Sequence, residues 1–291
     1  MLTVSEVSSF LNSFAPPALA ESWDNTGLLI GRESAEVSVV MTCLTITPDV
    51  AHEAVRERVQ LIVSHHPILF RAVRQMTDRT TEGATLLRLI EAGIAVYCPH
   101  TAFDSAPQGI NQGIAAALHL QDIAPLRPSV PGAIVGAGRI GRLPQPLVLS
   151  EFLPMVGVIL NAERIEYSGD PTGQVSRVAV ACGAADDLLP DAIRCDCDTF
   201  VTGESRLHTV LEARSRGVQL ILAGHFSSER PAVEQLAEVI AGQFRETRVF
   251  ASRSERNPLQ VWHNPGASPA SDRISQNPQP HQPETPSGTC S

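Results

Sequence analysis

Residues 53–67 read EAVRERVQLIVSHHP, and residues 212–226, EARSRGVQLILAGHF, nearly repeat them. Both stretches begin with Glu-Ala, continue with Val-Gln-Leu-Ile and then reach a histidine. A short apolar run of this length, flanked by polar residues, is typical of a buried strand. A repeat at a long, constant offset indicates one structural unit used twice. The sequence therefore predicts two related halves, each with a strand that ends near a histidine.

Strand and helix patterns alternate around both copies of the repeat. In the first half, strand patterns are VSVVMTCLTIT (37–47), VQLIVS (59–64) and IAVYC (94–98), with helical patterns between them. The second half has SRVAVACG (176–183), TFVTGE (199–204), VQLILAG (218–224) and TRVFAS (247–252), again with helical segments between. This alternation predicts an α/β fold with mostly parallel sheets. We expect a first lobe over 1–125 and a second over 126–263, of which 230–263 packs back on the first.

The remaining residues, 264–291, are rich in proline and nearly free of apolar side chains. A segment of this composition buries too little surface to offset the entropy lost on ordering, so we predict that it is disordered.

Composition excludes several classes of function. The net charge is −9, and all 22 basic residues are arginines, since the chain contains no lysine. Schiff-base catalysis and a lysine-containing phosphate loop are therefore excluded. An acidic chain without a basic run is not expected to bind nucleic acid non-specifically.

Cysteine usage and hydropathy predict a cytoplasmic protein. No apolar run approaches the 18 residues that a membrane span requires, and MLTVSEVSSF lacks the basic and apolar regions of a secretory signal. Six scattered cysteines in 291 residues do not resemble a disulfide framework. Cys195 and Cys197 have no second cysteine pair with which to form a zinc site, which favours a structural role.

Polar residues that can bind metals follow three of the predicted strands. His65 and His66 end one strand, and His225 ends its repeat. His100 and Asp104 follow IAVYC, and Glu229 stands four positions after His225, on the same face of a helical turn. Catalytic groups in parallel α/β sheets gather at the carboxyl ends of strands, so we expect these side chains to meet. A single histidine at a strand end is more often a core or capping residue. The alternative interpretation of His225 and Glu229 is a pair at a helix N-terminus, where the helix dipole favours the carboxylate. The three imidazoles of His65, His66 and His225 and the two carboxylates together suit two bridged divalent metals.

One motif favours a different function. GAGRIG, residues 136–141, matches the G-x-G-x-x-G pattern of dinucleotide-binding loops. Such a loop opens a helix, whereas Pro144 and Pro146 follow almost at once. We therefore expect no dinucleotide site.

Six motifs together resemble the Ngg-interacting-factor-three-like family, many bacterial members of which are labelled GTP cyclohydrolase 1 type 2 homolog. In chain order they are AESWDNTGLLIG, LIVSHHP, PHTAFD, GAGRIGRL, FVTGE and AGHFSSE. The similarity extends from about residue 4 to 262, and the joint occurrence of SHHP with GH-x-x-SE is highly specific. This chain lacks the inserted domain of some longer relatives.

The resemblance implies two related α/β lobes that face a shared dinuclear metal site, assembled into a toroidal homohexamer. It implies metal-ligand roles for His65, His66, Asp104, His225 and Glu229, with Glu229 as the bridge. His100 is then expected to contact substrate or to support a ligand. Glu204 and His208 either line the site or serve in packing and capping. Trp23, Asp24 and Asn25 are expected to shape a turn beside the site.

Two divalent metals about 3.5–4 Å apart would activate a bridging water and polarise an electrophile. The leading hypothesis is hydrolysis of a nucleotide-like or other small substrate, with no side chain assigned as catalytic. Histidine and carboxylate ligands admit zinc, manganese, iron, cobalt or nickel. The alternative is a non-catalytic, metal-binding regulatory or scaffold protein that acts through partners.

Overall fold

A computed structural model of the protein describes residues 1–262. Residues 1–258 form one compact unit, which contains two β-sheets. Within the described range, no helix is both long enough and apolar enough to cross a membrane. The predicted disordered segment, 264–291, lies outside the described residues.

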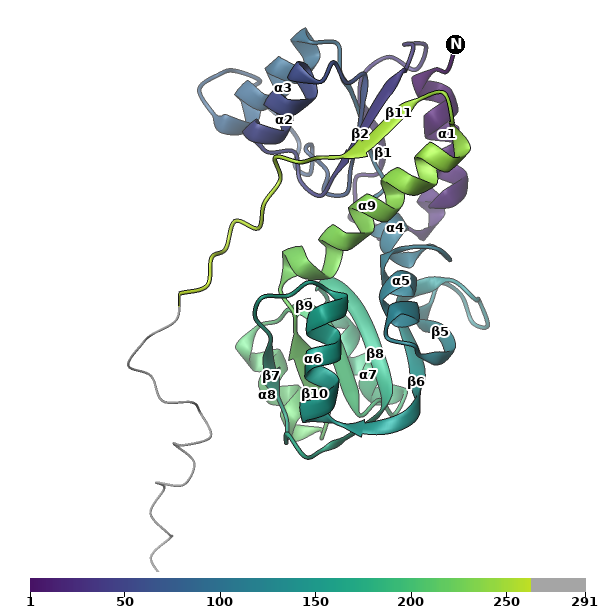
Figure 1. Ribbon diagram of the computed structural model, residues 1–291, viewed down its shortest axis with the longest axis vertical. Helices are drawn as coiled ribbons and strands as arrows, with labels where there is room; N and C mark the ends of the chain where they lie inside the picture. The colour runs from purple at the N-terminus through teal and green to yellow at the C-terminus, as the bar shows by residue number, and fades with distance from the viewer. Residues whose placement is uncertain (263–291) are drawn as a thin grey trace, which may run out of the picture. The chain divides into compact units, whose positions relative to one another are not determined.

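The first sheet has the strand order β1-β4-β3-β2-β11 (Figure 1). Its strands are β1 (Gly27–Ile30), β2 (Val39–Cys43), β3 (Leu61–Ser64), β4 (Ala95–Cys98) and β11 (Arg248–Ala251). All neighbouring pairs are parallel except β1 with β4. β11 pairs with β2 with Arg248 opposite Val39, so the end of the described chain returns to the sheet of the first half. The first copy of the repeat forms β3, as its pattern predicts.

The second sheet has the order β5-β6-β8-β9-β10-β7 and is mixed. Its strands are β5 (Gln121–Pro128), β6 (Gly136–Val148), β7 (Glu166–Ser168), β8 (Gln174–Ala184), β9 (Thr199–Glu204) and β10 (Gln219–Leu222). β8, β9 and β10 are parallel, while β5, β6 and β7 pair antiparallel with their neighbours. The second copy of the repeat forms β10. The expected lobe boundary at residue 125 falls inside β5, which belongs to this sheet.

The GAGRIG run begins strand β6 and does not open a helix. A dinucleotide-binding loop leads from a strand directly into a helix whose N-terminus faces the pyrophosphate. Here the glycine run begins a strand that pairs with β5 and β8, so it is part of the sheet.

The helices begin and end where local chemistry requires it. They are α1 (Val4–Phe14), α2 (Pro48–Arg56), α3 (Thr81–Glu91), α4 (His100–Ser105), α5 (Ile110–Ala117), α6 (Leu149–Ile159), α7 (Leu189–Arg194), α8 (Leu207–Ser215) and α9 (His225–Gln243), with short 3-10 turns at Pro17–Leu19 and Asp186–Leu188. Thr3 and Glu6 form a capping box at the start of α1. Thr47 caps α2, and Pro48 occupies its first turn, where the missing N–H costs nothing. α9 starts at His225 and continues through Pro231, so it holds His225 and Glu229 four positions apart on one face.

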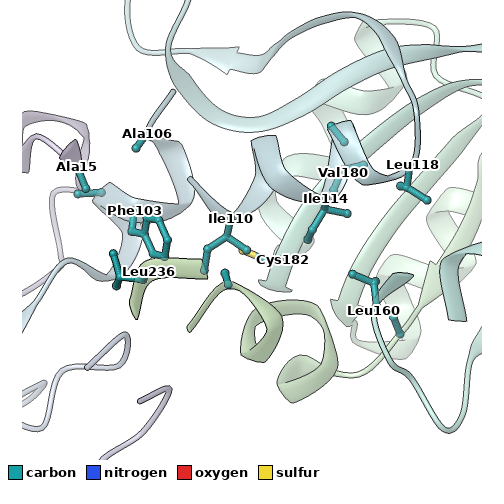
Figure 2. Packing of buried hydrophobic residues seen from close by; sticks show 14 of the residues in the cluster. Ala15, Phe103, Ala106, Ile110, Ile114, Leu118, Leu160, Val180, Cys182 and Leu236 are labelled. Atoms are coloured by element: carbon teal, nitrogen blue, oxygen red, sulfur yellow. The ribbon is translucent and has the colours of Figure 1, made fainter. Parts of the chain in front are cut away.

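One apolar cluster joins the two sheets. It contains Val63 of β3 and Val180 of β8, together with Ile110 of α5 and Leu236 of α9. Figure 2 shows Ile110 of α5 beside Cys182 of β8, and Phe103 of α4 beside Leu236 of α9. Removing most of a buried isoleucine costs about 2–5 kcal/mol. This shared core therefore holds the elements of both halves in fixed positions around the site.

Candidate metal site

The two adjacent histidines follow β3, where the chain has left strand geometry. β3 ends at Ser64, and the backbone N–H groups of His65 and His66 donate to Cys43 O and Leu44 O, at 2.9 and 2.8 Å. The Ser64 hydroxyl donates to His66 O at 2.8 Å, which stabilises the bend. Consecutive side chains of a regular strand point to opposite faces. The early end of β3 therefore lets both imidazoles approach one place, with ring centroids 5.1 Å apart.

Glu229 lies between two pairs of predicted ligands. Its Oε2 is 3.0 Å from His66 Nε2 and 3.1 Å from His225 Nε2. Its Oε1 is 3.8 Å from His65 Nε2, and that nitrogen is 3.6 Å from Asp104 Oδ1. The two carboxylate oxygens thus face different ligand pairs. The five residues come from the ends of β3 and β10 and from α4 and α9, and the structure brings all five together.

Three histidines have their outer ring nitrogens held by oxygen atoms. The Nδ1 of His66 lies 2.7 Å from Thr45 Oγ1, and the Nδ1 of His225 lies 3.0 Å from Glu204 Oε1. The Nδ1 of His100 lies 2.6 Å from an oxygen of Asp24. Metal-binding histidines almost always donate their second ring N–H to such a partner, which fixes the tautomer and the ring orientation. The pattern directs the Nε2 atoms of His66 and His225 toward Glu229 Oε2, which both of them contact.

His65 differs, because neither of its ring nitrogens has a hydrogen-bond partner although the side chain is only 2% exposed. Burial lowers the pKa of this imidazole to about 3, so the ring is neutral at pH 7 and has a free lone pair. An unsatisfied buried polar atom is costly unless something binds it. A metal ion that accepts this lone pair would satisfy one nitrogen, so His65 fits a metal-ligand role.

The carboxylates and His225 compensate one another in the metal-free site. Burial, reinforced by the charge of Glu229, raises the pKa of Asp104 to about 7. Burial also opposes ionisation of Glu229, but hydrogen bonds from His225 and His66 outweigh it and lower the pKa of Glu229. The hydrogen bond with Glu229 raises the pKa of His225 to about 9. Protons therefore supply the positive charge at this cluster when no cation is bound.

A glycine makes room for Glu229. Gly183 follows Cys182 near the end of β8 with φ +64°, and a Cβ there would lie 2.3 Å from Glu229 Oε1. The Gly183 N–H donates to Ser228 Oγ at 2.9 Å, and that hydroxyl donates to His225 O at 2.8 Å. Only glycine combines this conformation with this close approach. The glycine at the end of SRVAVACG is the one sequence signal of this contact.

The other predicted residues differ in their placement. Glu204 contacts His225, and His100 lies at the cluster, 5.3 Å from His65 between ring centroids. The ligand atoms of His65, His66 and His100 also lie within 4.8 Å of one another, so His100 adds a further imidazole to the site. His208 is exposed near the start of α8 and makes no hydrogen bond or ion pair with the cluster among the described residues. The expectation that His208 lines the site is therefore not supported.

Two oxygen partners of the histidines were not identified as such from the sequence. Asp24 was expected to shape a turn, and its second oxygen does accept from the backbone N–H of Thr101 at 3.1 Å. Burial opposes ionisation of Asp24, but hydrogen bonds from His100 Nδ1 and from the Thr101 hydroxyl outweigh it and lower the pKa of Asp24 to about 2. Thr45, in the segment between β2 and α2, has no sequence pattern that distinguishes it from a surface threonine.

The cluster opens into a pocket of about 320 Å³. Its lining includes Trp23, His100, Asp104 and Glu229, together with Leu188. Trp23 is 59% exposed and packs edge-on against Phe70 and His100, with ring centroids 5.9 and 6.0 Å apart. The described lining contains no arginine. The volume suits a small ligand that contacts the cluster at one end and an aromatic ring at the other.

Comparisons of sequence with known proteins agree with the resemblance. The profile of the family described as Duf34/NIF3 (NGG1p interacting factor 3) matches residues 2–258. The chain is 30% identical over 266 residues to a Clostridium acetobutylicum protein named GTP cyclohydrolase 1 type 2 homolog, covering 89% of this chain and 98% of the relative. It is 32% identical over 272 residues to the Schizosaccharomyces pombe protein named Protein NIF3 homolog, covering 88% and 96%.

A solved structure has the same fold. The Bacillus cereus protein related to NIF3 superimposes with a TM-score of 0.85 at 20% sequence identity, covering 90% of this chain and 99% of that protein. This likeness confirms the two-sheet α/β architecture.

Proposed function

This chain belongs to the Duf34/NIF3 family, and we propose that it binds two divalent metal ions at the cluster around Glu229. The first half-site consists of His65, Asp104 and Glu229 Oε1, which would hold one ion. The second half-site consists of His66, His225 and Glu229 Oε2, which would hold the other. The observation that supports this most strongly is the division of the two Glu229 oxygens between two ligand pairs. Mixed imidazole and carboxylate ligation is compatible with zinc, manganese, iron, cobalt or nickel.

We further propose that the metal-loaded protein is a hydrolase. A pair of divalent ions bound by these residues would supply Lewis acidity and a strong nucleophile at neutral pH. Among the chain's own groups, His100 is suited to move a proton at its Nε2. Burial opposes its protonation, but the hydrogen bond that its Nδ1 donates to Asp24 outweighs this and raises the pKa of His100. A protonated His100 would donate to a leaving group in the pocket.

The pocket constrains the substrate. The exposed ring of Trp23 provides an apolar face for a planar group, and such stacking does not require a charged ligand. Because no arginine belongs to the described lining, phosphate groups would depend on the metals for their charge compensation. Nucleotide-like compounds are the first substrates to screen, in keeping with the name of the Clostridium relative.

The test is metal content together with turnover. Protein freed of metal and reloaded with each candidate ion should hold about two ions per chain and hydrolyse at least one member of a nucleotide and phosphoester panel. His66→Ala should lose the ion of the second half-site. Absence of metal after reconstitution would refute the site, and absence of turnover with every ion would refute the hydrolase.

The second candidate is a metal-binding regulatory or scaffold protein, and the naming of the S. pombe relative after an interacting factor favours it. For this chain we propose a toroidal homohexamer in the cytoplasm. Large apolar side chains that remain exposed on one copy support contacts between copies. They include Val158, Leu207 and Ile134, which are 83%, 69% and 84% exposed. A mass in solution of six times 31.2 kDa is expected. Metal-dependent partner binding without turnover would favour the scaffold.

A further inference from the structure

The last described segment of the compact unit crosses back toward the site. Residues 252–256, which we call the strap, follow β11. Glu53 of α2 holds the strap, because its carboxylate accepts from the Ser252 hydroxyl at 2.6 Å and from the backbone N–H groups of Arg253 and Ser254, both at 3.0 Å. Both the Glu53 side chain and Ser252 are buried. The strap therefore has a defined position.

Glu255, in the strap, binds the segment that follows β2. Its Oε1 accepts from the backbone N–H of Thr45 at 2.6 Å, and its Oε2 accepts from that of Leu44 at 2.9 Å. Arg230, the residue after Glu229 on α9, places its Nε 3.0 Å from the same Oε2. Glu255 is only 6% exposed. One buried carboxylate thus joins the strap, the β2–α2 segment and the helix that contains Glu229.

The bound segment contacts His66 directly. The Thr45 hydroxyl lies 2.7 Å from His66 Nδ1, and Leu44 O accepts from the His66 backbone N–H. Glu255 therefore fixes, through two backbone N–H groups, the loop that orients the His66 ring toward Glu229. We infer that Glu255 is a positioning residue for the second half-site, acting through Thr45. This inference rests on the proposed metal function.

A carboxylate is suited to this position. Leu44 and Thr45 follow the last residue of β2. Within residues 1–262 their backbone N–H groups donate to Glu255 and not to a neighbouring strand. An ionised acceptor makes shorter and stronger bonds to such donors than a neutral one. The chain of contacts passes from Glu255 to Thr45 and then to His66, and it does not include His65 or Asp104. The first half-site should therefore be insensitive to Glu255.

The experiment compares Glu255→Gln and Thr45→Val with the wild-type chain in titrations of the metal-free protein with Co²⁺. Visible absorption and calorimetry report the affinity and coordination of each ion. Groups that orient metal ligands typically contribute 10–100-fold to affinity. We expect each variant to weaken the binding of the ion at the second half-site by about tenfold or more. The affinity for the ion at the first half-site should stay unchanged. Thr45→Val removes the hydroxyl without altering the strap. In the double variant the two effects should not add, because both act through the same hydrogen bond to His66.

Glu57→Gln is the matched control. Glu57 also joins the end of α2 to β11 through an ion pair, 2.7 Å from Arg248, but it has no hydrogen bond to the β2–α2 segment. The Glu57→Gln variant should therefore bind Co²⁺ at both half-sites with wild-type affinity. If Glu255→Gln binds Co²⁺ with wild-type affinity, or if its affinity falls equally at both half-sites, the positioning role is overturned and the metal proposal is not. A wild-type chain that binds no Co²⁺ at the histidine cluster would overturn the metal proposal and the inference with it.

Discussion

The substitution Glu229→Gln separates a bridged metal pair from two independent ions. Glutamine keeps the size of the side chain and one carbonyl oxygen, but it removes the negative charge between the two half-sites. The Glu229 side chain is only 5% exposed, and its Oε2 lies about equally far from His66 Nε2 and His225 Nε2, at 3.0 and 3.1 Å. Solvent therefore cannot replace the lost charge.

The size of the effect follows from this burial. Removing one member of a buried, hydrogen-bonded charge pair costs about 2–5 kcal/mol. At about 1.4 kcal/mol for each tenfold change in affinity, even the lower limit corresponds to roughly 30-fold weaker binding. Without the shared charge the two cations also repel each other more strongly. We expect Glu229→Gln to retain at most one ion per chain at concentrations that saturate the wild type.

The assay is calorimetric titration of the metal-free protein with Co²⁺, with elemental analysis of the loaded samples. Glu238→Gln is the control, because Glu238 is exposed on the same helix and belongs to no metal group. Both variants should fold, since the shared apolar core does not include Glu229. Two ions bound by Glu229→Gln with wild-type affinities would refute the bridging role.

Four further predictions concern neighbouring groups. Gly183→Ala should lower both the melting temperature and the metal content. The new Cβ would meet Glu229 Oε1 at 2.3 Å, and the φ of +64° is strained for alanine by about 1–3 kcal/mol. An unchanged melting temperature and metal content would contradict the close contact. Trp23→Ala should weaken substrate binding, seen as a raised KM, and leave metal content intact; loss of metal instead would mean that the ring supports the ligands. Metal affinity should fall as the pH drops through about 7, because a proton then competes for Asp104, and a flat pH profile from 6 to 8 would refute this. The metal-free fold should lose stability as the pH rises. The folded pKa of His225, about 9, lies above the usual value of 6.5, so its contribution is complete below pH 6.5 and is lost as the pH passes 9. Thermal melts in chelator across this window would show it.

The sequence predicted the parts of this site that depend on local pattern. β3 and β10 are short apolar runs, and the end of a strand fixes where the next side chain appears, so His65, His66 and His225 could be assigned to the carboxyl ends of these two strands. The spacing of His225 and Glu229 indicated a shared helical face, and one helix does contain both. These features are determined by neighbours within a few residues.

Contacts between distant segments could not be predicted in the same way. Glu255 binds Leu44 and Thr45 across more than 200 positions, and nothing near Thr45 in the sequence indicates that it faces a histidine. The antiparallel pairing of β6 with β8 also depends on how the middle of the chain is threaded. The position of His208 after β9 left both site lining and packing or capping open, and α8 presents its side chain to solvent.

The most direct test of the central claim is anomalous X-ray diffraction from crystals of the protein loaded with a single divalent metal. The account predicts two anomalous peaks on either side of the Glu229 carboxylate. One should be bound by His65, Asp104 and Oε1, and the other by His66, His225 and Oε2. A single peak, or peaks away from Glu229, would contradict it.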